Sequence, residues 1–481
     1  MASELRIHAG RAWIDGAFRP AVIDIADGVI VAITDPGDGE QGDAEPGTAE
    51  STGAPATGIR PATRPATVIV PDDAVLLPGL VDSHVHVNEP GRTEWEGFRS
   101  ATRAAAAGGV TTIVDMPLNS VPPTTSVAAL RVKQDAAAAS AFVDIGFWGG
   151  AVPGNLGGLA PLHEAGVYGF KCFLAPSGVD EFGHLDRSGL EAAMAEIAAL
   201  GSRLIVHAED PDHLHGDGAL GRGYAGFLAS RPPESEEAAI DAVIAAARRS
   251  GGRAHVLHLS DGRALPAIRA AKAEGIALTV ETCPHYLAIV AEDIPDGASE
   301  FKCCPPIREA ANQDLLWQGV VDGTIDAIVS DHSPSTVERK RAGDGDFGLA
   351  WGGISGLQVG LSAVWTEART RGIPLSTLIP LFTTGPAAVA GLAEAGRIAV
   401  GTPAHLTVFG VDDALHVQAR DLRHKNPISA YDGRELTGRI RRTWLRGVPI
   451  FDVEDVEDVN AASAAPAGRL LTAPHTERIA V

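Results

Sequence analysis

GLVDSHVH, at residues 79–86, is a short apolar run that ends in two histidines. Seven further runs of this kind follow, and Ala-rich stretches with helical periodicity lie between many of them. They occupy residues 111–115, 143–147, 167–171, 204–207, 254–258, 277–281 and 326–331. Eight alternations of an apolar run with a helical stretch are typical of a parallel barrel. The sequence therefore predicts an α/β fold with a (β/α)8 barrel over residues 76–400.

The segments on either side of this barrel have the pattern of short strands. Apolar and polar residues alternate near both ends of the chain, with Asp-Gly turns at 15–16 and 27–28. We expect residues 1–75 and 401–452 to form one small β-sandwich domain from both ends of the chain.

Two segments do not fit either domain. Residues 36–66 are rich in Gly, Pro, Ala, Thr and acidic residues. Such a composition buries too little apolar area to offset the entropy of ordering, so we expect a flexible loop. Residues 453–481 are rich in alanine and acidic residues and are expected to be a C-terminal tail.

The overall composition excludes several functions. The 481 residues include 39 Lys and Arg against 61 Asp and Glu, a net charge of −22. This charge argues against binding to nucleic acid or to an anionic membrane. We find no apolar stretch near the ~20 residues of a membrane helix, and no signal peptide in residues 1–20. With only four cysteines, the chain fits a reducing cytoplasm.

Polar residues stand at the ends of five of the expected barrel strands, where barrel enzymes have their active sites. These are His84 and His86, Lys171, His207, His258 and Asp331. The two histidines of the first run are two residues apart and so share one face of a strand. Imidazole and carboxylate groups are ligands of zinc and related divalent metals. A role as ordinary core or loop residues would explain a lone histidine, but not six such residues on five strand ends.

The lysine of this set has two possible roles, because an ammonium group cannot ligate a metal. Lys171 could be neutral with a depressed pKa, or it could be carbamylated by CO2, which would let it bridge two metals. The cluster makes carbamylation the more economical interpretation. Two metals would share a bridging hydroxide and polarise a substrate carbonyl. Asp331 would then act as the general base and deliver the proton to a leaving nitrogen.

Other catalytic devices are missing from the sequence. We find no serine elbow and no Walker-type loop at the strand-helix junctions. The Cys303-Cys304 pair has no second cysteine pair with which to form a zinc site, and we interpret it as buried small side chains.

The strand-end residues resemble those of the binuclear cyclic amidohydrolases, which include hydantoinases (dihydropyrimidinases), dihydroorotases and allantoinases. The resemblance implies a distorted barrel, a β-sandwich domain, a homotetramer and two divalent ions, zinc first, with Co2+, Mn2+ or Fe2+ as alternatives. It also implies that Lys171 is carboxylated by CO2 and bridges the two ions. By matching position, the first metal would be held by His84, His86, Lys171 and Asp331. The second would be held by Lys171, His207 and His258.

Longer motifs are similar to those of the allantoinase family. They are NEPGRTEWEGF at 88–98, DMPLNS at 115–120, KCFL at 171–174, CPHYL at 283–287, KCCPPIR at 302–308, SDHSP at 330–334 and WGGISGLQ at 351–358. Some of these strings are shared with the sister families, but the set is specific. The resemblance implies that the small-molecule substrate is allantoin, whose ring amide is hydrolysed to give allantoate in purine breakdown.

Single positions separate this family from its sisters. Dihydroorotases usually carry an arginine for a substrate carboxylate where this chain has Asn88, and hydantoinases usually carry a tyrosine where it has Pro176. Cys304 departs from the serine that is usual in allantoinases. The expected substrate contacts are Asn88, Asn119, Ser177, Cys304 and Gly353. Capping of loops is the alternative role for the two asparagines.

Two other functions stay open from the sequence. One is a hydantoinase or dihydropyrimidinase with broader ring specificity. The other is a metal-free scaffold protein of the same fold, against which the retention of all six candidate ligands argues.

Overall fold

A computed structural model describes residues 4–36, 65–216, 218–454 and 465–474. Most of the loop expected at 36–66 and much of the expected tail lie outside these residues. Within the described part of the chain, no helix is both long enough and apolar enough to cross a membrane.

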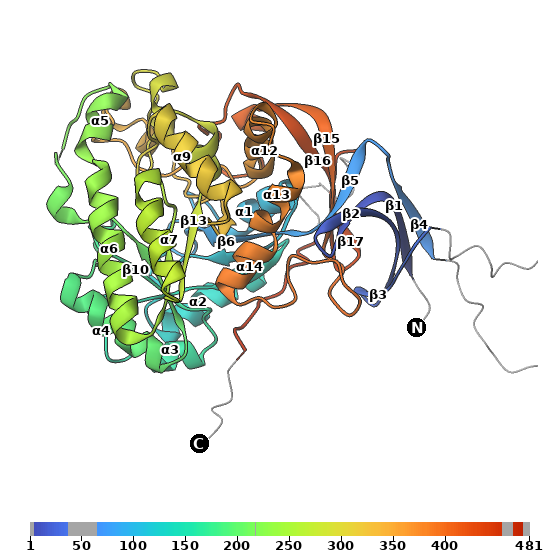
Figure 1. Cartoon of the computed structure of the whole chain (residues 1–481), viewed down its shortest axis with the longest axis horizontal. Helices are drawn as coiled ribbons and strands as arrows, with labels where there is room; N and C mark the ends of the chain where they lie inside the picture. The colour runs from blue at the N-terminus through green and yellow to red at the C-terminus, as the bar shows by residue number, and fades with distance from the viewer. Residues whose placement is uncertain (1–3, 37–64, 217, 455–464, 475–481) are drawn as a thin grey trace, which may run out of the picture.

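Strands from both ends of the chain form one mixed sheet of eight strands, on the right of Figure 1. Its order is β17-β16-β15-β5-β1-β2-β3, and β4 pairs with β1. The strands are β1 (Leu5–Ile14), β2 (Ala17–Ala26), β3 (Val29–Thr34), β4 (Ala66–Val70), β5 (Ala74–Pro78), β15 (Leu406–His416), β16 (Glu435–Leu445) and β17 (Val448–Asp452). The β domain expected from the two ends of the chain is therefore present. Strand β5 straddles the boundary that we expected between residues 75 and 76.

The turns of this sheet follow from its sequence. Asp15-Gly16 and Asp27-Gly28 both have positive φ at each residue, which a tight hairpin turn requires and which Asp-Gly adopts at low cost. The inward-facing residues of β1 and β2, such as Ile7 and Ile23, are fully buried. They pack with Leu406 of β15 in a core that belongs to the sheet itself.

The second part of the chain is a parallel barrel, as the sequence predicts. Its strands are β6 (Leu80–Val85), β7 (Val110–Asp115), β8 (Asp144–Phe147), β9 (Gly149–Gly150), β10 (Phe170–Phe173), β11 (Arg203–His207), β12 (Arg253–Val256), β13 (Leu278–Thr282) and β14 (Ala327–Ile328). They form a three-stranded sheet, β6-β7-β8, and a six-stranded sheet, β9 to β14. A parallel bridge from Val85 to His332 links the first strand to the segment after the last one.

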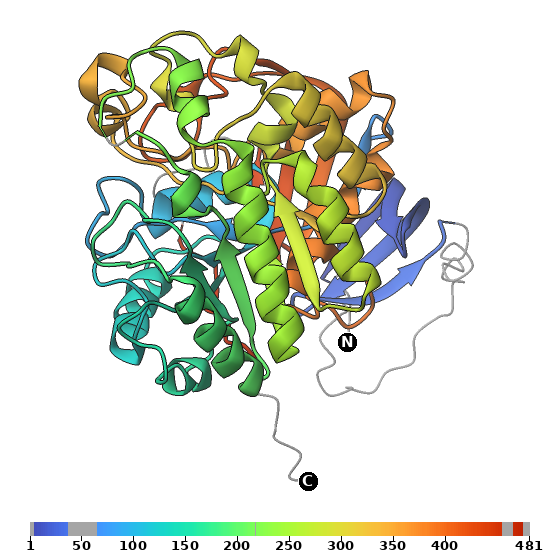
Figure 2. The ribbon, with the colours of Figure 1, turned by 60° about the vertical axis from the view of Figure 1, so that its left-hand side comes forward.

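Helices alternate with these strands and cover the outside of the barrel (Figures 1 and 2). They are α1 (Phe98–Ala107), α2 (Val127–Ala138), α3 (Ala160–Glu164), α4 (Arg187–Ala199), α5 (Tyr224–Ser230), α6 (Pro233–Ser250), α7 (Leu265–Ala273), α8 (Pro284–Ala288), α9 (Ala310–Val321), α10 (Val337–Lys340), α11 (Ala342–Gly345), α12 (Gly360–Thr370), α13 (Leu375–Phe382) and α14 (Thr384–Ala390). The longest, α6, begins at a proline with two glutamates in its first turn and ends at Gly251 in the left-handed region. These are the residue types that helix ends favour.

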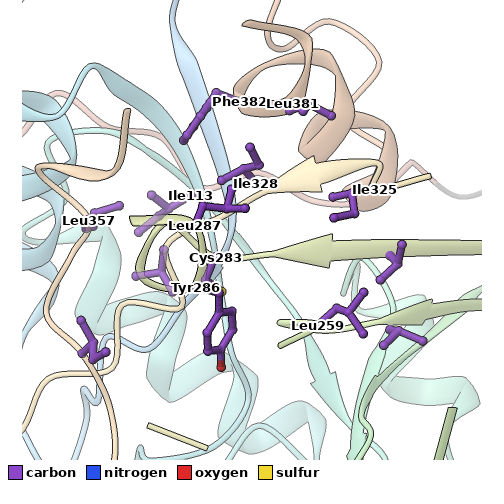
Figure 3. Close-up of a cluster of buried hydrophobic side chains, with 14 of the residues drawn as sticks. Ile113, Leu259, Cys283, Tyr286, Leu287, Ile325, Ile328, Leu357, Leu381 and Phe382 are labelled. Atoms are coloured by element: carbon purple, nitrogen blue, oxygen red, sulfur yellow. The ribbon is translucent and has the colours of Figure 1, made fainter. Parts of the chain in front are cut away.

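Apolar side chains from several elements meet where the last strands pack against helices (Figure 3). Ile113 of β7, Ile328 of β14 and Leu287 of α8 are fully buried, and Phe382 of α13 is nearly so. Close packing of this kind resists small shifts. It therefore gives the neighbouring strand ends, which carry the site, a rigid support.

The segment at residues 466–473 lies beside β8, whereas the sequence analysis assigned it to the tail. The Ile145 amide donates to the Arg469 carbonyl (2.9 Å), and the Leu471 amide donates to the Ile145 carbonyl (2.8 Å). The segment therefore lies along the free edge of β8 and widens the β6-β7-β8 sheet as a further strand would. Its apolar run is too short to be recognised by periodicity.

Asp144 at the start of β8 connects this strand to the β16–β17 turn and to the segment at residues 466–473. Its buried carboxylate accepts from Arg446 of the β16–β17 turn (2.7 and 2.8 Å) and from the Arg469 amide (2.8 Å). We expect Asp144→Ala to lower the free energy of unfolding by about 3 kcal/mol, because it removes the carboxylate partner of a largely buried guanidinium. Urea unfolding measures this loss. The control is Glu274→Ala, which removes the half-exposed pair with Arg248 and should cost less than about 1 kcal/mol. Equal losses in the two variants would contradict the assigned role of Asp144.

Candidate metal centre

The six strand-end residues of the sequence analysis lie together at the carboxyl ends of the barrel strands. His84 lies in β6, with His86 just beyond its end, Lys171 in β10 and His207 at the end of β11, while His258 and Asp331 follow β12 and β14. All six are buried. The fold therefore brings residues from five strands into one cluster, as the barrel topology requires.

One group of donors surrounds the carboxylate of Asp331. Its Oδ1 lies 3.1 Å from His84 Nε2 and 3.4 Å from His86 Nε2. These ligand atoms all lie within 4.8 Å of one another. Lys171 Nζ lies 3.4 Å from the same His84 nitrogen. Two imidazoles and a carboxylate in this arrangement match the donor set of zinc and similar ions.

A second pair of donors lies on the other side of His84. His207 Nδ1 and His258 Nε2 face each other at 3.0 Å, and the rings of His84 and His258 are 5.3 Å apart. His207 Nε2 contacts the Glu209 carboxylate at 2.8 Å, an acceptor that requires the proton on this nitrogen. His207 Nδ1 then presents a lone pair. A cation between the two rings would satisfy this lone pair and that of His258 together, so these residues fit a second metal.

Acceptors behind the histidines fix how the rings are turned. Glu281 Oε1 lies 2.5 Å from His84 Nδ1, and Asn119 Oδ1 lies 2.9 Å from His86 Nδ1. With Glu209, each of the three rings has an oxygen on the nitrogen that faces away from the cluster, the usual support of a metal-binding histidine. The sequence analysis missed Glu209 and Glu281. A glutamate within an expected barrel strand, as Glu281 is in LTVET, was the available signal.

Burial changes the chemistry of Lys171. Removal from water lowers the pKa of this lysine to about 8, although the carboxylates of Asp331 and Glu281 act in the opposite direction. A lower pKa increases the fraction of the neutral amine. The neutral amine is the form that can react with CO2, so the surroundings of Lys171 favour carbamylation.

Several residues of the site have a strained backbone. Asn88, Asn119, His258 and Asp331 all have φ between 35° and 68°, in the region that non-glycine residues rarely adopt. Asparagine and aspartate tolerate this region better than histidine does. Residues held in such conformations cluster at functional sites because the surrounding structure over-determines them.

A cavity of about 450 Å³ opens above the cluster. Five of the six strand-end residues line it, whereas His84 lies beneath them. The substrate contacts expected from the sequence all line the same cavity: Asn88, Asn119, Ser177, Cys304 and Gly353. Some of their polar atoms are already engaged, because Asn88 Nδ2 donates to the Pro334 carbonyl and Ser177 Oγ to the Phe182 carbonyl. The contact of Asn88 fits its alternative role, which is to cap a loop.

Comparison with known proteins identifies the family of the chain. The model of the amidohydrolase family matches residues 75–450, so the chain belongs to this family. Within it, the chain is 54% identical to an allantoinase of Streptomyces avermitilis, over 92% of this chain and 94% of that protein. A probable allantoinase of rice, Oryza sativa, is 44% identical over 79% of this chain and 78% of that protein.

A solved structure has a similar fold. The L-hydantoinase (dihydropyrimidinase) of Arthrobacter aurescens superposes with a TM-score of 0.85 at 28% sequence identity. The match covers 98% of this chain and all of that one. The barrel and the β domain built from both ends of the chain are therefore shared between the two proteins.

Proposed function

We propose that this protein hydrolyses the ring amide of allantoin to give allantoate. The observation that carries the proposal is the 54% identity to an allantoinase over nearly the whole chain, together with a cluster of metal-ligand residues that opens into a cavity. The protein is thus proposed to be a metal-dependent cyclic amidohydrolase of purine breakdown.

The site would hold two divalent ions. We propose that His84, His86, Lys171 and Asp331 bind one ion and that Lys171, His207 and His258 bind the other, with Lys171 carboxylated. The donors suit Zn2+ best, and Co2+, Mn2+ and Fe2+ use similar ligands. When bound, such ions polarise a carbonyl and make water more acidic.

The protein side chains move the proton. The Asp331 carboxylate lies at the floor of the cavity and would accept the proton of the attacking water. The same carboxyl group would then pass this proton to the ring nitrogen as the amide bond breaks. The cavity walls around it, which include Phe173 and Trp351, would keep bulk water away from the reacting atoms.

The polar groups of the cavity suit a neutral substrate. Asn88 stands where an arginine would bind a substrate carboxylate, and allantoin has none. Lys302 also lines the cavity, but its ammonium group is engaged by the carbonyls of Gly348 and Ala350. We propose that Asn88, Asn119, Ser177, Cys304 and Gly353 contact the ring and its ureido substituent.

A substrate panel tests the proposal. We expect the metal-replete protein to turn over allantoin with a kcat/KM at least about 10²-fold above that for hydantoin, which lacks the ureido group, since unpaired polar groups in a site reject such analogues. Dihydrouracil and dihydroorotate should be poorer still. Product formation is measured for each compound at equal enzyme concentration. Similar rates on hydantoin and allantoin would instead support the broader hydantoinase activity.

Two further properties are proposed on the same resemblance. The protein is expected to be a homotetramer in the cytoplasm. Light scattering of the eluted peak in size-exclusion chromatography measures the mass, and a monomer would contradict the first property. Cell fractionation checks the second.

A further inference from the structure

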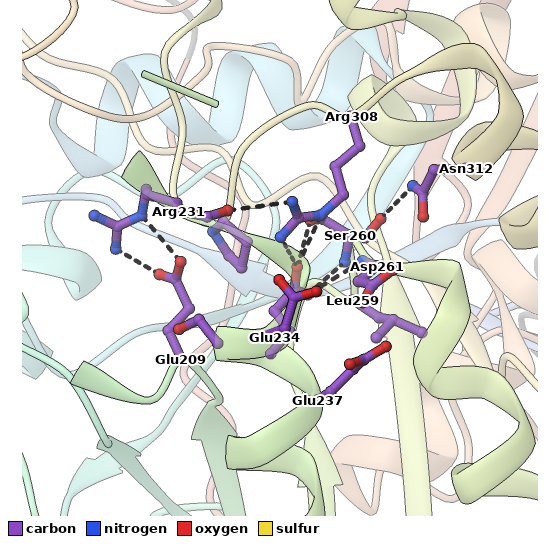
Figure 4. Close-up of polar contacts among 12 residues, drawn as sticks. Glu209, Arg231, Glu234, Glu237, Leu259, Ser260, Asp261, Arg308 and Asn312 are labelled. Atoms are coloured by element: carbon purple, nitrogen blue, oxygen red, sulfur yellow. Dashed lines mark hydrogen bonds and ion pairs between the residues drawn. The ribbon is translucent and has the colours of Figure 1, made fainter. Parts of the chain in front are cut away.

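A buried glutamate joins a proposed metal ligand to an arginine in the cavity wall. Glu209 is fully buried, and its Oε2 lies 2.8 Å from His207 Nε2. The guanidinium of Arg231 donates to both oxygens of this carboxylate, from Nε at 2.9 Å and from Nη2 at 2.6 Å (Figure 4). Arg231 also lines the cavity. Only the carboxylate of Glu209 therefore separates this arginine from the histidine.

The two-pronged contact fixes the plane of the carboxylate. A guanidinium fork allows one orientation of its partner, whereas a single ammonium group would allow many. The oxygen on His207 is thereby held in place, and with it the tilt of the ring. On its far side the ring presents Nδ1, 3.0 Å from His258 Nε2.

A second buried ion pair holds the backbone of Arg231. Arg308 Nη1 donates to the Arg231 carbonyl at 3.2 Å (Figure 4), and Arg308 Nη2 donates to Glu236 of α6 at 2.7 Å. Glu236 also accepts from the hydroxyl and amide of Ser260. The first turn of α6 is thus connected to His207 through a continuous series of hydrogen bonds.

Stability alone does not explain this arrangement. Taking two charges out of water offsets much of their attraction, so a buried ion pair often adds little net stability. The geometry it imposes on a neighbouring ligand is a more direct consequence. Oxygens behind metal-binding histidines affect metal affinity by about 10- to 100-fold.

We propose that Arg231 is a positioning residue that acts through Glu209 to aim His207 Nδ1 at the second metal. The inference rests on the binuclear site of the proposed function. The affinity of one of the two ions thereby depends on the geometry of the Arg231 side chain, whereas the affinity of the ion held by His84, His86 and Asp331 does not.

Metal titration of purified apoprotein with Zn2+ against a chromophoric chelator tests the proposal. In Arg231→Gln we expect one of the two equivalents to bind about 10- to 100-fold more weakly, with the other unchanged. Arg231→Lys should recover part of the loss, because an ammonium group keeps the charge but not the fork. The control is Arg187→Gln. It removes an arginine whose side chain is 75% exposed and whose contact with Asp210 is long, at 3.4 Å. This variant should bind both ions as the wild type does.

A double-variant cycle shows whether the effect passes through Glu209. If it does, Arg231→Gln combined with Glu209→Gln should weaken the binding of the second ion no more than Glu209→Gln alone does. Additive effects, or two equivalents of unchanged affinity in Arg231→Gln, would overturn the proposal. Loss of both ions together with a lower melting temperature in Arg231→Gln and Arg231→Lys alike would also overturn it, because this points to general unfolding. Wild-type protein that binds two ions but leaves allantoin intact would refute the proposed substrate and not this inference.

Discussion

Asp331→Asn is expected to reduce kcat/KM by about 10³-fold or more while both metals stay bound. Burial by itself would raise the pKa of this carboxyl group, but His84 and His86 outweigh burial and hold the pKa well below its usual range. The carboxylate is therefore ionised at neutral pH and can accept a proton. An amide cannot, although its oxygen can still face a metal, and general base catalysis contributes about 10² to 10⁴ in rate.

Rates on allantoin and metal content per chain check this expectation together. The matched control is Asp180→Asn, an exposed residue near the cavity loop at Ser177, which should keep wild-type rates. Near-normal turnover by Asp331→Asn would refute the role of this residue in moving the proton. Loss of both metals would show that Asp331 matters mainly as a ligand.

Lys171→Ala is expected to reduce metal content from two equivalents to one or none, with loss of activity. The ammonium form would repel cations, so we expect this lysine to bind the ions as the proposed carbamate, which alanine cannot form. Metal analysis of the dialysed protein measures the loss. Two full equivalents in Lys171→Ala would mean that another group bridges the ions.

Small molecules can distinguish the carbamate from a neutral amine at this position. If Lys171 carries a carboxylate, an added short-chain carboxylic acid should restore part of the metal binding to Lys171→Ala, and an added alkylamine should not. Rescue by the amine alone would contradict carbamylation. Lys302→Ala is the control, because the ammonium group of this other cavity lysine donates to the carbonyls of Gly348 and Ala350, and this variant should keep two equivalents.

Much of the barrel could be predicted because its strands are short apolar runs with a polar residue at a fixed end. The run at 79–86 becomes β6, and the residues that end it, His84 and His86, come to lie beside Asp331. The carboxyl ends of the strands in a parallel barrel meet on one face. Residues at these ends are therefore expected to lie close together even when they are far apart in the sequence. The roles of these residues in catalysis stay predictions.

The supporting residues could not be found in the same way. Glu209 and Arg231 lie 22 positions apart. No local sequence pattern predicts that the residue after α5 contacts the segment that follows β11. The left-handed backbone at His258 is likewise set by the surrounding fold rather than by its own residue type. The pairing of Leu471 with β8 depends on an open strand edge that a sequence does not display.

One property of the fold has a consequence for biosynthesis. Strand β5 is an antiparallel partner of β15, with Pro78 opposite Leu406, and the whole barrel lies between these two strands in the sequence. Chains are synthesised from the N-terminus, and early domains usually fold first. On one edge β5 lies beside β1, but the ribosome must deliver the complete barrel before β15 can pair with the other edge. The edge of β5 that pairs with β15 thus stays open during most of translation, and exposed strand edges of this kind are prone to pairing with other chains.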